Sequence, residues 1–319
     1  RVSLAPLFPL LLASFAALAI FRAHSAQGSL SSSLSVAGAG PAVRGRGLAS
    51  LGGRGLRGQD SRCRRGSLAA NADATLYDIP VSNHGARVRM LIYAKGIEDK
   101  VKVESPQALG GIKGEEYLKL NPLGKMPILI LDDDKTCIPE STVILHYLDS
   151  TYPDKSLTPA TPAQRARSDL FAQAIDSYLT PIQGCMYRGP MEASIRASQL
   201  KDVRKYLDFL EHVLSDPTTI GAGAGPFCAG AEPSLGDIVA YPSVVFAEYM
   251  LPKKFGWNDV FENRPALKKW WEAMNAWQPA AKVHEEMTEA LVKWDNDGRW
   301  VKVGIDDQVK SLQGLVWAY

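Results

Sequence analysis

Three short polar segments contain the side chains best suited to chemistry. The first, Ser82-Asn83-His84, offers a hydroxyl, an amide and an imidazole directly after a short apolar run. The second is the loop at 121–127, with a lysine between two prolines, and the third is the pair Glu140-Ser141. Each lies at the predicted start of a helix or strand, and the positive end of a helix favours anions. These segments could therefore bind or stabilise an anionic ligand, although serine is also an ordinary helix cap.

The elements that would position these segments form a small α/β unit. A strand at 75–78 precedes a helix at 83–96, in which Val88, Leu91 and Ile92 recur at helical spacing. A second strand at 101–103 completes a parallel strand-helix-strand unit with a right-handed crossover. Downstream follow a strand, a turn, an antiparallel strand and a helix, at 127–131, 132–134, 136–138 and 141–152. That order predicts a thioredoxin-like domain with a mixed sheet and flanking helices.

Strand signals almost vanish after Pro153, and helical patterns dominate through about Lys293. Apolar residues recur at helical spacing within 203–213 and again within 267–274. A Pro- and Thr-rich stretch at 157–162 marks the change. We therefore predict an α+β protein of two domains. Its parts are a thioredoxin-like domain at 73–153, a linker at 154–162, an all-helical domain at 163–293 and a tail at 294–319.

Composition limits the classes of partner. The chain has 319 residues, 46% of them hydrophobic, which suffices for two globular domains. Its 36 lysines and arginines nearly balance 34 aspartates and glutamates, so no overall field favours nucleic acid or an anionic membrane. The four cysteines are scattered without metal-ligand spacing or a C-x-x-C pair, which argues against zinc or a disulfide framework. We expect a small-molecule partner and no metal.

The first 72 residues differ in composition from the remainder. An apolar run at 4–21 is followed by Arg22 and small residues, as in a signal peptide, with a retained membrane anchor as the alternative. From 27 to about 71 the chain is rich in Ser, Gly, Ala and Arg, and the first acidic residue is Asp60. This composition cannot bury a core and predicts a disordered transit peptide. Together the two parts predict a leader directed to a plastid, with simple secretion as the alternative.

Four separated motifs resemble those of the soluble glutathione transferase family. They are a strand and loop at 76–88, the Asn-Pro-Leu-Gly-Lys-Met-Pro segment at 121–127, the Glu-Ser helix start at 139–148, and the Ser-Leu-Gly-Asp-Ile segment at 234–238. The second motif is the most specific, because it closely matches the family's Asn-Pro-x-Gly-x-x-Pro loop. The resemblance covers about Thr75 to Lys293. It implies a glutathione-binding thioredoxin-like domain, an all-helical second domain and, by analogy, a homodimer.

The resemblance gives Ser82 the catalytic role of the family's serine classes. Glutathione is a thiol with an ordinary pKa of roughly 8.5, so its reactive thiolate is scarce at neutral pH. A hydroxyl at the mouth of the helix would donate a hydrogen bond to the sulfur, and the positive helix end would assist. Lowering the thiol pKa by about two units requires about 2.7 kcal/mol. Asn83, His84 and Tyr77 are secondary candidates for this role.

The other two N-terminal motifs would hold the tripeptide. The resemblance implies a cis peptide bond before Pro127, with the Met126 backbone pairing with the cysteinyl backbone of glutathione. Glu140 would accept a hydrogen bond from the γ-glutamyl ammonium, while Ser141 and the helix amides would bind its carboxylate. Lysine side chains could hold the glycyl carboxylate. The glutathione site that the resemblance implies consists of Lys113, Lys125, Met126, Pro127, Glu140 and Ser141.

The resemblance also places the electrophile pocket in the first helices of the second domain. The stretch at 181–190 interrupts the helical pattern with two glycines and two prolines, as a pocket-lining bend or a bend between packed helices would. The pocket-lining residues implied are Tyr178, Met186, Tyr187 and Arg188. Cys185 lies in the same bend, and we expect it to be buried and not reactive. Ser234 and Asp237 form a predicted capping box, which we assign to folding.

We therefore predict a glutathione S-transferase that conjugates the glutathione thiolate to a small apolar electrophile. Glutathione acts as a cosubstrate, and no bound cofactor is needed. Two alternatives stay open: a glutathione-dependent isomerase or peroxidase that uses the same thiolate, and a non-catalytic binding or scaffold protein with this fold. The family's disulfide-reducing classes carry cysteine at the position of Ser82, so thiol exchange is disfavoured. The mature protein is expected to bind neither nucleic acid nor membrane.

Overall fold

The computed structural model describes residues 74–132, 136–220 and 225–312, which all belong to one compact unit. The leader predicted at 1–72, most of the turn predicted at 132–134 and the last residues of the tail lie outside the described residues. Throughout these described ranges, no helix combines the length and apolar character that crossing a membrane requires.

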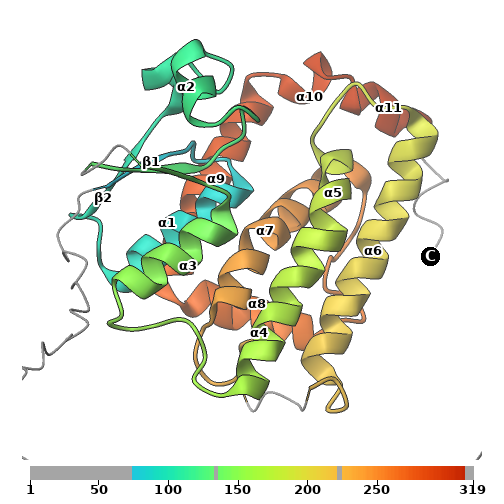
Figure 1. Ribbon diagram of the computed structural model, residues 1–319. Coiled ribbons are helices and arrows are strands. Elements are labelled where there is room, and N and C mark those ends of the chain that lie inside the picture. Colours follow the sequence, from blue (N-terminus) through green and yellow to red (C-terminus); the bar gives the residue numbers. More distant parts are fainter. Residues whose placement is uncertain (1–73, 133–135, 221–224, 313–319) are drawn as a thin grey trace, which may run out of the picture. The chain divides into compact units, whose positions relative to one another are not determined.

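A four-stranded mixed sheet forms the centre of the N-terminal half (Figure 1). Its strands are β1 (Ala74–Tyr77), β2 (Val101–Glu104), β3 (Ile128–Leu131) and β4 (Cys137–Pro139). They lie in the order β2-β1-β3-β4, with β1 parallel to β2 and antiparallel to β3, and β4 antiparallel to β3. This arrangement confirms the predicted thioredoxin-like fold.

Helices α1 (Asn83–Lys95) and α3 (Ser141–Thr151) cover one face of this sheet and pack against each other. Val88 and Leu91 of α1 are completely buried, as their spacing predicts. The helix begins after Ser82 and ends at Gly96, whose φ of 65° lies in the left-handed region that glycine adopts at low cost. The short helices η1 (Pro106–Leu109) and α2 (Glu115–Leu120) connect β2 to β3 and were not predicted.

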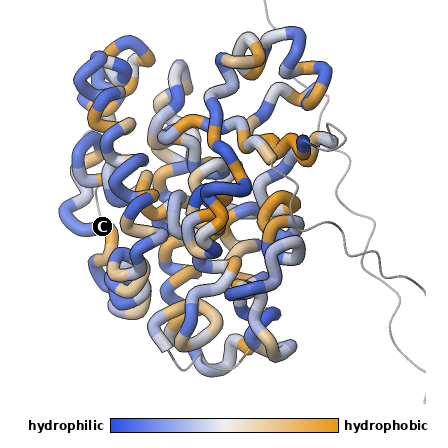
Figure 2. Tube along the Cα trace, turned by 90° about the vertical axis from the view of Figure 1, so that its left-hand side faces the viewer, coloured by the Kyte–Doolittle hydropathy of each residue, from blue (hydrophilic) through white to orange (hydrophobic). Residues whose placement is uncertain are grey.

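The regular secondary structure described in the second half is helical, apart from one isolated β-bridge between Phe227 and Gly230. Its longer helices are α4 (Pro162–Ala174), α6 (Ala193–Ser215), α7 (Leu235–Phe255), α8 (Pro265–Ala276), α9 (Gln278–Asn296) and α11 (Ile305–Leu312). Helix α7 lies at the centre, where it packs against α1, α4 and α9, and most of its residues are buried. The outer helices carry long hydrophilic stretches, in contrast to the apolar interior (Figure 2).

The start of α7 contains the capping box that the sequence predicts. Asp237 is completely buried, and its carboxylate accepts hydrogen bonds from the backbone N–H and hydroxyl of Ser234 at 2.8 and 2.7 Å. The same carboxylate accepts bonds from the Cys228 backbone N–H and the Trp270 indole, both at 2.8 Å. One side chain therefore links α7, α8 and the loop that precedes α7.

Candidate active site

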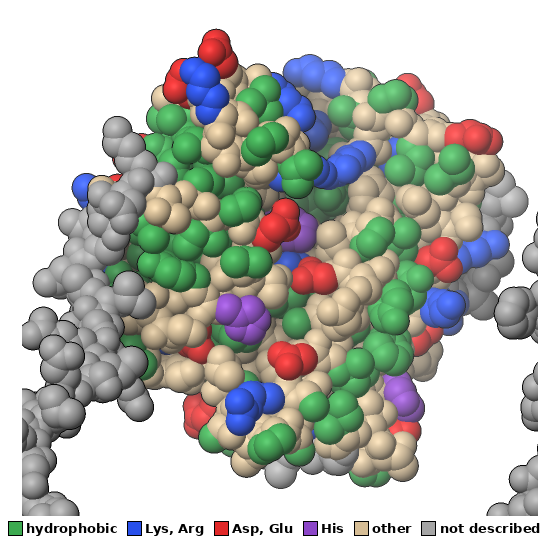
Figure 3. Space-filling model, in the orientation of Figure 1, with side chains coloured by type: hydrophobic (Ala, Val, Ile, Leu, Met, Phe, Trp, Pro, Cys, Tyr) green, Lys and Arg blue, Asp and Glu red, His purple; other side chains and the backbone are tan. Residues whose placement is uncertain are grey.

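A cleft of about 710 Å³ opens between the sheet-containing half and the helical half. Figure 3 views the face on which it opens, with basic side chains along the upper part of the hollow and acidic side chains at its lower edge. The cleft is lined by the β1–α1 loop, the loop at 121–127 and the start of α3 on one side, and by parts of the short helix α5 (Thr180–Ile182), α7 and α9 on the other. All three polar segments that the sequence singles out thus meet in one cavity.

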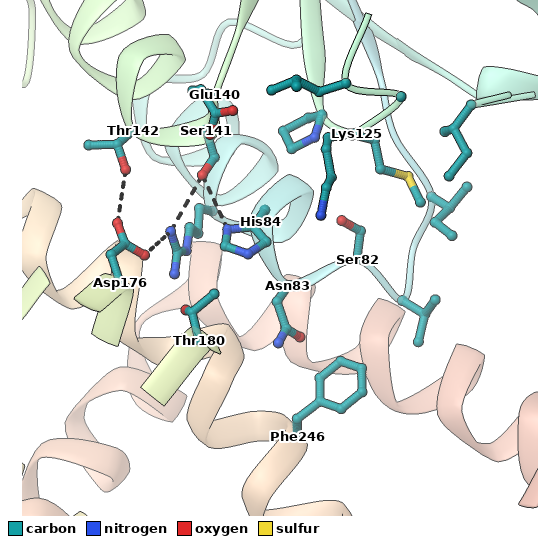
Figure 4. Close-up of a pocket in the computed structure, with 18 of the residues that line it drawn as sticks. Ser82, Asn83, His84, Lys125, Glu140, Ser141, Thr142, Asp176, Thr180 and Phe246 are labelled. Atoms are coloured by element: carbon teal, nitrogen blue, oxygen red, sulfur yellow. Dashed lines mark hydrogen bonds and ion pairs between the residues drawn. The ribbon is translucent and has the colours of Figure 1, made fainter. Parts of the chain in front are cut away.

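Ser82 lies at the amino terminus of α1, inside the cleft. Its hydroxyl oxygen accepts a hydrogen bond from the Gly85 backbone N–H at 3.1 Å, so Ser82 caps the helix. The hydroxyl also has a proton to donate, for which the buried carboxylate of Asp78 is an acceptor within the protein and from which it could turn to a ligand. In Figure 4 the side chain of Lys125 extends toward Ser82, which places a cation beside the hydroxyl. The capping role and a role toward a sulfur anion are therefore compatible.

A buried arginine holds the loop that carries Ser82. Arg89 projects from α1, and its guanidinium contacts Asp78, the carbonyls of Ile79 and Pro80, and Glu286 of α9. The bonds to the two carbonyls measure 3.0 and 2.7 Å, and the bond to Glu286 measures 2.9 Å. Because Glu286 belongs to the helical half, this arginine fixes the Ser82 loop to both halves.

His84 follows Ser82 and faces the start of α3. Its Nδ1 lies 3.4 Å from the hydroxyl oxygen of Ser141. Burial, followed by the nearby positive charge of Arg87, lowers the pKa of His84 to about 4. The imidazole is therefore neutral near pH 7, and it would act on a thiolate through hydrogen bonding and not through charge.

This neutral state gives a pH-dependent expectation. Below its ordinary pKa of 6.5 the imidazole takes up a proton in the unfolded chain, whereas in the folded chain it does so only near pH 4. The free energy of unfolding therefore decreases as the pH falls from about 6.5 to about 4. The variant His84→Gln should not show this decrease. Between about pH 7 and about pH 4 the wild type should lose about 3 kcal/mol relative to the variant. Urea unfolding at several pH values measures this difference, and parallel pH profiles would contradict it.

Arg87 forms a second polar cluster in the cleft that the motifs did not reveal. This side chain is 1% exposed and forms an ion pair with Asp176 at 2.8 Å. It also donates to the hydroxyl of Ser141 at 3.4 Å, while Thr142 donates to Asp176 at 3.2 Å (Figure 4). The Nε and Nη2 atoms of Arg87 have no hydrogen-bond partner within the described chain. Both atoms are buried, so Arg87 acts here through its charge and through its bond to Ser141, next to the amino terminus of α3, where a carboxylate is favoured.

The loop at 121–127 is held by side chains of the loop itself and of α2. The peptide bond between Met126 and Pro127 is cis, as the resemblance implies. The carbonyl of Lys125 accepts bonds from the Tyr117 hydroxyl at 2.7 Å and from the Asn121 amide at 2.9 Å. This leaves the ammonium of Lys125 free to enter the cleft, where the described residues offer it no ion pair.

Glu140 immediately precedes α3 and has an unusual backbone conformation. Its φ is 70° and its ψ is 117°, a region that a residue with a side chain adopts at a cost of roughly 1–3 kcal/mol. Such strain persists where surrounding structure imposes it, often beside a ligand site. Glu140 and Ser141 both line the cleft, together with Met126 and Pro127.

The helical wall of the cleft is mainly aromatic. Tyr187 and Phe246 contact each other with ring centroids 5.0 Å apart, and Trp294 of α9 and Arg188 complete this wall. In Figure 4 Phe246 and Thr180 face Asn83 from the helical half. Trp294 belongs to the tail for which the sequence suggested no chemistry. Its position depends on how α9 folds back on α1, so local sequence contained no signal for it.

Four of the residues singled out from the sequence do not line the cleft. Tyr178 is 48% exposed and stacks on Tyr206 at 5.6 Å, because a π-helical turn at Ile175–Leu179 directs it away from the cleft. Met186 is completely buried in the hydrophobic core. Tyr77 lies within β1, and Lys113 is exposed with its ammonium packed beside Gly124.

Cys185 is completely buried, as predicted. Burial raises the pKa of its thiol to about 12, which removes it as a nucleophile at neutral pH. Its backbone carbonyl accepts a hydrogen bond from Arg196 and so helps to shape the bend. In the part of the chain that the structure describes, no group of three or more His, Cys, Asp or Glu side chains is arranged to hold a metal ion.

Comparison with known proteins identifies the family. Residues 76–156 match the profile of the glutathione S-transferase N-terminal domain, and residues 162–273 match that of its C-terminal domain. Probable maleylacetoacetate isomerase 1 of Drosophila melanogaster is 31% identical over 173 residues, which are 53% of this chain and 67% of that protein. Glutathione S-transferase 1 of Dianthus caryophyllus is 28% identical over 179 residues, 53% of this chain and 75% of that protein.

Solved structures show the same fold. Glutathione transferase F2 from Populus trichocarpa superimposes with a TM-score of 0.55 at 22% identity, over 68% of this chain and 99% of that one. The chain therefore belongs to the glutathione S-transferase family, as its motifs indicate. Members of this family are enzymes that use glutathione as a cosubstrate without a bound prosthetic group.

Proposed function

We propose that this protein transfers glutathione to a small electrophile and that Ser82 stabilises the attacking thiolate. The observation that supports this most directly is the position of the Ser82 hydroxyl. It lies at the positive end of α1, beside Lys125, in the same cleft as the Arg87–Ser141 cluster. A sulfur anion placed there would receive a hydrogen bond from the hydroxyl and favourable charge from the helix end and the lysine.

The remaining groups of the cleft suit the ends of the tripeptide. The γ-glutamyl carboxylate fits the hydroxyl of Ser141 and the amides of α3, with the buried positive charge of Arg87 behind them. The γ-glutamyl ammonium fits Glu140, and the glycyl carboxylate fits Lys125. The sulfur then attacks an electrophile held against Tyr187, Phe246 and Trp294. A carbon–sulfur bond forms while the leaving group departs with its electron pair.

The first test measures the thiolate itself. The full chain is mixed with glutathione, and the ultraviolet thiolate band is titrated against pH, alongside a conjugation assay with a chloronitroaromatic compound. A bound thiol pKa well below 8.5 together with conjugation supports the proposal. Binding without a thiolate band would leave a glutathione-binding scaffold, and an absence of binding would overturn the glutathione site.

Glutathione-dependent isomerisation is a second candidate, because several relatives carry that name. Maleylacetoacetate isomerase of Rattus norvegicus is 30% identical over 176 residues, 54% of this chain and 77% of that protein. The same thiolate would add reversibly to a double bond and so permit rotation. Conversion of a cis to a trans unsaturated acid, catalytic in glutathione, would distinguish this activity from conjugation, which consumes glutathione.

We also propose that the protein is a homodimer delivered to a plastid by its two-part leader. The dimer is supported by the fact that members of the family typically dimerise. The destination is supported by the composition of residues 1–72. Retention in the secretory pathway of a fluorescent protein fused to residues 1–75 would rule out the plastid. Sedimentation of the full chain at the mass of a monomer would rule out the dimer.

A further inference from the structure

The helical wall of the cleft contains a cation that the glutathione subsites leave unused. Among the described residues, the lysines and arginines that line the cleft are Arg87, Lys125 and Arg188. Arg87 is paired with Asp176 and lies beside Ser141, and Lys125 extends toward Ser82. Both lie where the proposed function places the two carboxylates of glutathione. Arg188 is exposed and forms no ion pair with a described carboxylate.

The backbone around Arg188 is held firmly. Its N–H donates to the carbonyl of Gly184 at 2.8 Å, and its own carbonyl accepts a bond from Arg196 at 2.8 Å. Arg196 is completely buried, and its Nε donates to Gln308 of α11 at 2.7 Å. The side chain of Arg188 crosses Gly184, where an added Cβ would lie 3.2 Å from the Arg188 Cδ. The backbone and the stem of Arg188 are therefore placed by well-held structure, while its guanidinium is exposed.

Aromatic groups surround this cation on the electrophile side. The guanidinium carbon lies 5.6 Å from the ring centroid of Tyr187, which in turn contacts Phe246. Burial raises the pKa of Tyr187, and the charge of Arg188 opposes that rise. Arg188 is also one of the charges that lower the pKa of His84, so its field reaches the Ser82 side of the cleft. Two described carboxylates line the same cleft: Asp176, which is paired with Arg87, and Glu140, which the proposed function assigns to the γ-glutamyl ammonium.

An exposed guanidinium on a well-held backbone, next to aromatic rings, suits a particular kind of second substrate. A guanidinium can bind a carboxylate through two parallel hydrogen bonds, and such charge-assisted bonds are stronger than neutral ones. We propose that Arg188 is the anion-binding group of the electrophile subsite and that the second substrate carries a carboxylate next to an apolar or aromatic body. This inference rests on the proposed glutathione transfer and refines the expectation of a purely apolar electrophile.

The test compares two electrophiles that differ in charge, 1-chloro-2,4-dinitrobenzene and 4-chloro-3-nitrobenzoate. Arg188→Met removes the charge and keeps an apolar stem, and Arg188→Lys keeps the charge without the paired hydrogen bonds. Arg188→Met should lower kcat/KM for the benzoate about 30-fold, roughly the value of one charge-assisted contact, and for the neutral compound less than about threefold. The kcat/KM of Arg188→Lys for the benzoate should lie between the values of the wild type and Arg188→Met. Lys268→Met, which removes an exposed cation outside the cleft, is the matched control and should change neither rate.

A binding measurement separates this proposal from the proposed function. S-(4-carboxybenzyl)glutathione and S-benzylglutathione need no turnover, and their Kd values can be measured by calorimetry. In the wild type the carboxylated ligand should bind more tightly than S-benzylglutathione, and Arg188→Met should reduce this ratio of Kd values about 30-fold. The KM for glutathione should stay unchanged. If the protein shows no conjugating activity but still prefers the carboxylated ligand in a way that depends on Arg188, the proposed transfer is wrong and the anion site is retained. Equal losses for both ligands, or no loss for either, would overturn the anion site.

Discussion

At pH 6.5 the ionised fraction of bound glutathione should be about 50-fold lower in Ser82→Ala than in the wild type. In the wild type we expect a bound thiol pKa about two units below 8.5, so that about half of the thiol is ionised at this pH, against about 1% without the hydroxyl. The fall in rate should be smaller, about fivefold to tenfold at that pH, because a more basic thiolate is also more nucleophilic. Titration of the ultraviolet thiolate band measures the first quantity, and kcat/KM against pH measures the second.

Ser82→Gly separates the hydroxyl from the helix cap. Alanine at this position costs about 1 kcal/mol of cap stability, whereas glycine costs only a few tenths. If the hydroxyl acts on the sulfur, both variants should show the same raised thiol pKa despite different stabilities. A thiol pKa that follows stability would assign Ser82 to folding alone. A pKa unchanged in both variants would move the role to Asn83 or His84, which line the same end of the cleft.

Asp237→Ala should lower the free energy of unfolding by about 4 kcal/mol. The substitution leaves the backbone N–H groups of Cys228 and Ser234 and the indole N–H of Trp270 without their acceptor, all in buried positions. Each buried donor without a partner costs about 1–3 kcal/mol. This is a large part of the 5–15 kcal/mol that usually separates folded from unfolded states. Urea unfolding of the full chain, followed by tryptophan fluorescence, measures the change.

Asp237→Asn gives a graded comparison. Asparagine keeps one oxygen, which can continue to accept from Cys228 and Trp270, while its amide faces the N–H of Ser234. The expected loss is therefore about half, or about 2 kcal/mol. Glu232→Ala removes an exposed carboxylate from the same loop and should change stability by less than about 0.5 kcal/mol. Equal effects of Asp237→Ala and Glu232→Ala would contradict the role of the buried carboxylate.

The elements that position the site could be predicted because their signals are local. The alternation of a short strand with an apolar-faced helix predicts β1 and α1 to within one or two residues. Serine followed three residues later by aspartate predicts the cap of α7, since both partners lie within one helical turn. The loop at 121–127 could be read from its prolines, and its cis peptide bond is present in the structure.

Local sequence alone indicated the four strands, the helices α1 and α3, the family motifs and the burial of Cys185, but not η1 or α2. Only the tertiary structure decided which distant side chains share the cleft. Arg87 meets Asp176 because α1 packs beside the helical half, and Trp294 reaches the cavity because α9 folds back against α1. Tyr178 turns away because the helix gains a π-helical turn at Ile175–Leu179. These positions depend on how separate helices pack, which is set by the summed shape of many buried side chains and not by any short pattern along the chain.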